Sequence, residues 1–197
     1  CSSVPVTTTV VVNALPIATA ANNGPVCVGE LLTLAGGPDG MVSYSWTGPD
    51  GFTSNQQNPT VSATATTLMA GVYTLYVTDA NCTSLPTTTT VVVNVLPVAT
   101  AANNGPICAG ETLMLTGGPA GMATYSWTGP GGFTSSLQSP TIAAATAAMS
   151  GDYTLIVTDA NCTSLPVTTS VVVYPLPVVT ATSNSPVCTG GTLQLTA

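Results

Sequence analysis

The chain has 197 residues, no Lys, Arg or His, and seven carboxylates, which give a net charge of −7. Only 4% of the residues are charged but 45% are hydrophobic, which indicates a folded chain rather than a disordered one. Without basic residues the chain lacks the groups that neutralise phosphates, and without His it lacks His-dependent catalysis and His-ligated metal sites.

We therefore expect no nucleic-acid partner, no cofactor and no enzyme activity from this sequence. No apolar run reaches about 18 residues, so we expect no membrane insertion in this segment. A mildly acidic, base-free and Thr-rich composition favours an extracellular or cell-surface location. The chain begins with Cys and not Met, which predicts an internal piece of a longer protein.

The sequence repeats itself at an offset of 81 and then 80 residues. CSSVPVTTTVVVN at 1–13 recurs at 82–94 and 162–174, and NNGPVCVGELLTL at 22–34 recurs at 103–115 and, more loosely, at 183–195. This pattern predicts four parts. They are the last strand of a preceding repeat (1–13), two full repeats (14–94 and 95–174) and the first strands of a following repeat (175–197).

Each full repeat divides into short predicted strands separated by Gly, Pro, Asn and Asp turns. In chain order, the strands expected in the first repeat are 14–20, 26–28, 31–35, 41–47, 51–54, 60–66, 73–78 and 86–95. No stretch has the period of an amphipathic helix. Short strands with turn signals about every eight to twelve residues are typical of an all-β sandwich.

The strand at 73–78 has the clearest pattern, and the chain contains it twice, as GVYTLYVTDANC (71–82) and GDYTLIVTDANC (151–162). Its side chains alternate with a period of two, which predicts one buried face.

The motifs PVCVGELLTL (25–34), YSWTGPDGFTS (44–54) and GVYTLYVTDANC, with their second copies, resemble the tandem immunoglobulin-like repeats of giant secreted surface proteins of Bacteroidota, including gliding-motility adhesins. This resemblance covers the whole chain and implies immunoglobulin-like β-sandwiches in a linear head-to-tail array. It also implies a core Trp and a Tyr that forms the corner hydrogen bond of this fold. The core residues expected are Leu34, Trp46, Tyr73, Leu75, Leu115, Trp127, Tyr153 and Leu155.

The six cysteines form two sets, which predict disulfides in an extracellular chain. Cys1, Cys82 and Cys162 follow the predicted strand at 73–78 or its counterparts, whereas Cys27, Cys108 and Cys188 precede the strand at 31–35 or its counterparts. In an immunoglobulin topology these two turns lie at opposite poles, roughly 25 Å apart at about 3.3 Å per residue.

A disulfide needs its Cα atoms within about 7 Å, and in a head-to-tail array the two kinds of pole face each other at each joint. We therefore favour an interdomain Cys27–Cys162 bond, with Cys1, Cys82, Cys108 and Cys188 bonded to neighbouring repeats. Internal pairs (Cys27–Cys82 and Cys108–Cys162), a Cys82–Cys108 pair and free thiols remain open alternatives.

Glu30 and Asp159 would be neighbours across such a joint, which makes them a weak calcium candidate. Two carboxylates are few for Ca²⁺, which takes six to eight oxygen ligands. The third copy also has Gly191 where the first has Glu30. The sequence therefore favours solvated turn residues and no metal site.

The function that these patterns favour is a structural segment of a long extracellular filament or adhesin stalk, stiffened by disulfides. Its partners would be further copies of the same repeat, and lateral homotypic contacts in a filament stay open. The alternatives are a ligand- or glycan-binding adhesin module and an accessory domain of a secreted enzyme.

Overall fold

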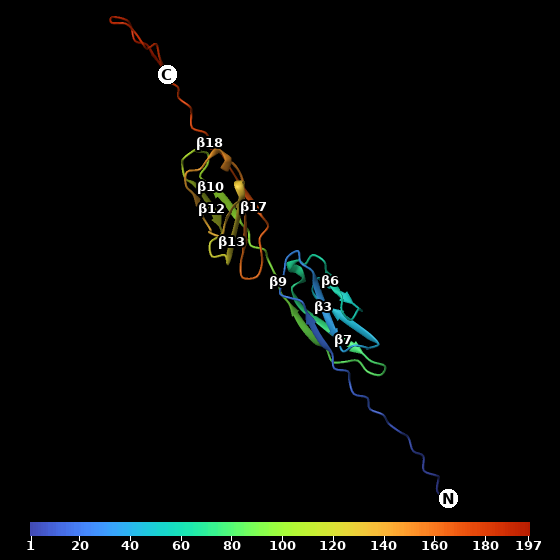
Figure 1. The fold of residues 1–197 in the computed structure, drawn as a ribbon. Helices are drawn as coiled ribbons and strands as arrows, with labels where there is room; N and C mark the ends of the chain where they lie inside the picture. Colours follow the sequence, from blue (N-terminus) through green and yellow to red (C-terminus); the bar gives the residue numbers. More distant parts are fainter. The chain divides into compact units, whose positions relative to one another are not determined.

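The computed structural model describes residues 1–197, which divide into two compact units, Cys1–Leu96 and Pro97–Ala197 (Figure 1). Both units are all-β, with short 3₁₀ turns and no α-helix, which confirms the predicted all-β class. None of the helical turns is long or apolar enough to cross a lipid bilayer.

Short strands make up both units. The elements of the first unit are β1 (Thr19–Asn22), β2 (Val26–Cys27), β3 (Leu32–Gly37), β4 (Ser43–Thr47), η1 (Pro49–Gly51), β5 (Thr53–Ser54), β6 (Thr60–Ser62), η2 (Thr67–Met69), β7 (Gly71–Thr78), β8 (Thr87–Val91) and β9 (Val93–Asn94). Those of the second unit are β10 (Thr100–Asn103), β11 (Ile107–Cys108), β12 (Leu113–Gly118), β13 (Thr124–Gly129), η3 (Pro130–Gly132), β14 (Phe133–Ser135), β15 (Thr141–Ile142), η4 (Ala147–Met149), β16 (Gly151–Thr158), β17 (Val167–Val171) and β18 (Val173–Tyr174), followed by a hairpin of β19 (Thr182–Ser183) and β20 (Leu195–Thr196).

The two units share one sheet topology. In the first, a three-stranded sheet has the order β1-β3-β6 and a four-stranded sheet has the order β5-β4-β7-β8. The second unit repeats this with β10-β12-β15 and β14-β13-β16-β17. A short parallel pair, β2 with β9 and β11 with β18, adds to each unit. This strand order is that of an immunoglobulin-like β-sandwich.

The core of each unit lies between its two sheets, where the inward residues of alternating strands meet. The eight residues expected in the core, Leu34, Trp46, Tyr73, Leu75, Leu115, Trp127, Tyr153 and Leu155, are all buried. On β7 the burial alternates along the strand, with Tyr73, Leu75 and Val77 inside. The period-two pattern therefore corresponds to the buried face of the central strand.

A tyrosine corner stands at the start of the central strand in both units. The hydroxyl of Tyr73 donates a hydrogen bond to the carbonyl of Met69 at 2.9 Å, and that of Tyr153 donates to the carbonyl of Met149 at 3.1 Å. Burial raises the pKa of both phenols. The corner fixes the 3₁₀ turn before the strand to the strand itself.

Several strand ends differ from those expected. The first strand was expected at 14–20 but is Thr19–Asn22, because Thr19 is the first residue with a partner, Gly37, on β3. The strand expected at 60–66 ends at Ser62, where the Ser62 hydroxyl and the Thr64 backbone form a turn.

The last strand of the repeat was expected as one segment at 86–95, but it is divided into β8 and β9 at Val92. The carbonyl of Val92 accepts the N–H of Val26, so the strand changes partner there and continues beside β2.

Candidate functional site

The turn between β2 and β3 holds Cys27 through a reciprocal pair of hydrogen bonds. The N–H of Cys27 donates to Glu30 Oε2 at 2.7 Å, and the N–H of Glu30 donates to the Cys27 carbonyl at 3.0 Å. The N–H of Ala65 donates to the Glu30 carbonyl at 2.7 Å, which fastens the turn to the neighbouring loop. The backbone of Cys27 is thus fixed by hydrogen bonds within its own turn.

The same turn recurs in the second unit and, without its carboxylate, near the end of the chain. The N–H of Cys108 donates to Glu111 Oε2 at 2.6 Å. In the third copy Gly191 replaces the glutamate, yet its N–H still donates to the Cys188 carbonyl at 2.8 Å. Glu30 and Glu111 therefore support a turn that the backbone can form alone.

The turn after the central strand holds the second set of cysteines. Asp79 Oδ1 accepts the N–H groups of Asn81 and Cys82, both at 2.7 Å, and Asp159 accepts those of Asn161 and Cys162 at the same distances. This is an Asx-type turn, in which the side chain replaces a backbone acceptor. A buried hydroxyl anchors the following residues, because Ser84 Oγ accepts the N–H of Val77 at 3.1 Å.

The hydrogen bonds in these turns favour the ionised form of both aspartates. The backbone N–H groups of Asn81 and Cys82 lower the pKa of Asp79, and those of Cys162 and Asn161 lower the pKa of Asp159. The turns that carry the cysteines are therefore held most firmly when these carboxylates are charged.

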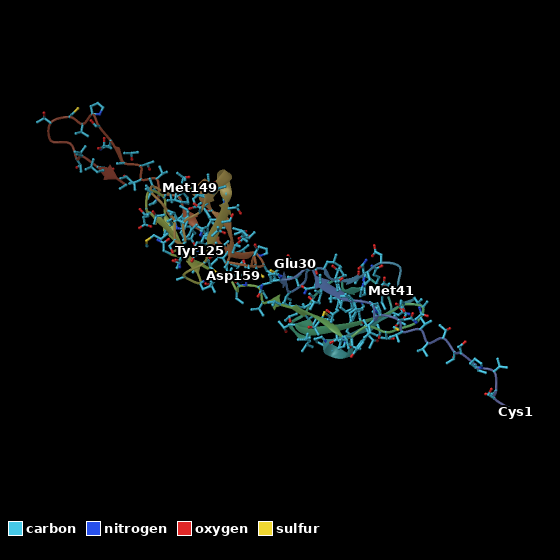
Figure 2. All side chains as sticks on the ribbon, turned by 90° about the horizontal axis from the view of Figure 1, so that it is seen from below. Cys1, Glu30, Met41, Tyr125, Met149 and Asp159 are labelled. Carbon is cyan, nitrogen blue, oxygen red and sulfur yellow. The ribbon has the colours of Figure 1, made fainter.

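The two kinds of turn lie at opposite poles of each unit. Cys27 is paired through β2 with Asn94, at the end of β9, whereas Cys82 precedes the start of β8. At about 3.3 Å per residue, β8 and β9 together span about 23 Å. In Figure 2, Glu30 and Met41 mark the two ends of the first unit, and Met149 and Asp159 mark those of the second.

The cysteines differ in chemical state although their turns are near copies. Cys27 and Cys162 are disulfide-bonded, whereas Cys1, Cys82, Cys108 and Cys188 are free thiols. The alternative pairings within one repeat, Cys27–Cys82 and Cys108–Cys162, each need Cys82 or Cys108, and both of these residues are free thiols. Burial follows the same division, because Cys27 is 9% exposed and Cys162 is 2% exposed, but Cys108 is exposed.

The carboxylates of the weak calcium candidate have local roles. Glu30 and Asp159 each cap the turn that carries a cysteine, through the hydrogen bonds described above. No cluster of three or more Cys, Asp or Glu side chains is placed to hold a metal ion. Their role as caps was missed in the sequence, although the spacing of Glu30 and Asp79, each three residues from a cysteine, is a usable signal.

Comparisons with known proteins give no family. No family model and no curated protein matches the sequence. Among solved structures, one chain in the crystal structure of a mouse coronavirus receptor-binding domain complexed with its murine receptor is 13% identical, with a TM-score of 0.42. The match covers 77% of this chain and 98% of that chain. Murine CEACAM1b is 13% identical, with a TM-score of 0.40 and coverage of 81% and 100%. An amphioxus IgVJ-C2 molecule is 16% identical, with a TM-score of 0.33 and coverage of 73% and 96%. TM-scores this low do not assign a fold, so the immunoglobulin-like class is based on the strand order.

Proposed function

We propose that this chain is a structural segment of a long extracellular filament or adhesin stalk, built from immunoglobulin-like domains in a head-to-tail array. Its partners are further copies of the same repeat, it acts at the cell surface, and it is not an enzyme. The resemblance of its motifs to repeats of giant secreted Bacteroidota proteins supports this proposal, as does the fold of each unit.

The chemical state of the cysteines carries the proposal. We use the word staple for a disulfide across the connection between two repeats. A staple at every connection would bond the cysteine of the β2–β3 turn in one repeat to the cysteine of the turn after the central strand in the next repeat, which pairs Cys27 with Cys162. The two cysteines that are disulfide-bonded are these two, and their counterparts Cys82 and Cys108 are thiols. In the array, Cys1, Cys82, Cys108 and Cys188 would find their partners in neighbouring repeats.

The mechanism is mechanical. A Cys27–Cys162 bond closes a loop of about 135 residues, for which the chain-entropy model gives about 4–5 kcal/mol of stabilisation. A Leu-Pro pair also stands at each connection between repeats, at 15–16, 96–97 and 176–177. Pro restricts the backbone of a linker, so each connection between repeats is stiffened by its proline as well as by the disulfide.

Peptide mapping under non-reducing conditions tests the pairing. Trypsin has no sites here, so the alkylated chain is cut after Asp and Glu. This places Cys1 and Cys27 in 1–30, Cys82 and Cys108 in 80–111, and Cys162 and Cys188 in 160–197. The proposal expects 1–30 joined to 160–197, with the alkyl groups located by fragment sequencing on Cys1, Cys82, Cys108 and Cys188. A cross-link from 80–111 to either of the other two peptides refutes the staple.

A ligand-binding module is the second candidate. A hollow of about 320 Å³ lies between η3 and η4 of the second unit, lined by Phe133, Ile142, Met149 and Tyr153 among others. An apolar hollow with a few polar groups is the usual form of a small-ligand site. Titration of a glycan panel, followed by the NMR signals of the Met149 methyl group, tests this candidate.

A further inference from the structure

The charges of the first unit are confined to its turns. Glu30, Asp39, Asp50 and Asp79 all lie between strands or in η1, so no strand of this unit carries a charge. In a chain with seven acids and no base, a contact between two copies is repulsive wherever carboxylates meet. Two copies can therefore meet through the strand faces of the first unit without repulsion between carboxylates.

The outer face of the four-stranded sheet in this unit presents a row of hydroxyl groups. The register places Thr53 beside Thr47, Thr47 beside Thr74, and Thr74 beside Thr88, so one threonine from each strand stands in line. Thr47, Thr53 and Thr88 are exposed and Thr74 is half-buried. Strands lie about 4.8 Å apart, so the hydroxyls form an evenly spaced line across the sheet.

Two exposed apolar side chains stand on this face next to the row. Val72, which is 54% exposed, and Tyr76, which is 38% exposed, lie two residues before and after Thr74 on β7. We call these six residues, Thr47, Thr53, Val72, Thr74, Tyr76 and Thr88, the hydroxyl face. It combines uncharged hydrogen-bonding groups with apolar area, and it contains no carboxylate.

We propose that the hydroxyl face binds the hydroxyl face of a second copy of this chain, so that stalks associate side by side. A two-fold contact places like groups against like groups. A hydroxyl is both donor and acceptor and can pair with its own copy, which a carboxylate cannot do. The row therefore has the chemistry that a self-complementary interface requires.

The size of the face sets the strength of the contact. Four strands of about five residues cover about 300 Å² on each partner, whereas a stable interface buries about 800 Å² on each side. One pair of faces is thus a weak contact. Other repeats of a stalk that keep this face uncharged would add such contacts by avidity, without any new chemistry.

The second unit has the same row of threonines, but a charged side chain stands beside it on the same face. Thr134, Thr128, Thr154 and Thr168 stand in line as their counterparts do. The counterpart of Val72 is Asp152, the one carboxylate of the chain that lies on a strand, and it is exposed. In a two-fold contact between these faces, Asp152 would oppose a like charge of the partner, which disfavours association. The hydroxyl face of the first unit is therefore the adhesive one.

Sedimentation equilibrium of the full chain, with free thiols alkylated, tests the proposal in a concentration series that reaches the millimolar range. We expect reversible self-association that strengthens as salt is added, because salt screens the repulsion between the acidic poles. V72D should weaken the association constant about tenfold or more, since it places like charges opposite each other. D152V should strengthen it, a gain that misfolding cannot produce.

Two control variants separate the effect of where a charge lies from the effect of the net charge on association. T60D adds the same charge to the outer face of the three-stranded sheet, and D39N removes one charge from a loop; neither should change association by more than about twofold. Any of three results overturns the proposal. The chain stays monomeric at high salt, T60D weakens association as much as V72D, or D152V does not strengthen association. None of these results depends on the disulfide pairing, so the stalk proposal is tested separately.

Discussion

Replacing Gly117 by Ala tests whether the second core is packed as described. The added Cβ would lie 2.6 Å from the Gln138 carbonyl oxygen, 2.9 Å from Leu155 Cδ2 and 3.1 Å from Trp127 Cζ2. The carbonyl has little freedom to move, because it also accepts the indole N–H of Trp127 at 3.2 Å. Gly36 stands in the same position beside Trp46 in the first unit.

The expected cost follows from this crowding. Adding a methyl group to a close-packed core costs about 1–3 kcal/mol. The displaced carbonyl can also lose its hydrogen bond to the indole, so we expect G117A in the upper half of this range. For a unit of this size, each 1 kcal/mol lowers Tm by about 4–8 °C.

Denaturant unfolding, followed by the fluorescence of Trp127 in a variant that lacks Trp46, measures the cost in the second unit alone. Gly121 gives the control, because G121A adds a Cβ with no atom within 4 Å, at a φ of +80°. That variant should lose only about 1–2 kcal/mol, from the left-handed backbone. Unfolding of G117A at the wild-type midpoint, or a smaller loss than in G121A, would refute the packing argument.

Three further predictions concern the corner, the turns and the joint. Y153F removes the hydrogen bond to Met149 and should cost about 0.5–1.5 kcal/mol, measured by denaturant unfolding; no change would mean that the bond is absent in solution. Because the folded pKa of Asp79 and Asp159 is lowered, their contribution is present above the unfolded value of about 3.9 and is lost as pH falls through the folded value. D79N/D159N should therefore flatten the acid limb of the stability–pH profile, and an unchanged limb would contradict these hydrogen bonds. If the staple joins Cys27 to Cys162, C162S should broaden the distance distribution in small-angle X-ray scattering. The matched control C108S, at an exposed free thiol, should leave it unchanged. An equal distribution in C162S and wild type would remove the stiffening role.

Much of the fold could be predicted because its signals are local. Alternation along GVYTLYVT marks a half-buried strand wherever the strand is placed, and it corresponds to the buried Tyr73, Leu75 and Val77 of β7. The candidate site was harder to predict. The two sets of cysteines are visible in the sequence, but the capping roles of Glu30 and Asp79 depend on how each turn folds.

The sequence by itself determined the repeats, the all-β class and the identity of the core, because composition and a period of two depend only on neighbouring residues. Only the tertiary structure decided where strands begin, divide and align, since the partner of Thr19 lies 18 residues away and that of Thr74 lies 14 away. The line of threonines across four strands is a consequence of that register, and register is a long-range property of hydrogen bonding. The state of each cysteine has the same origin, because nearly identical turns carry bonded and free thiols in one chain.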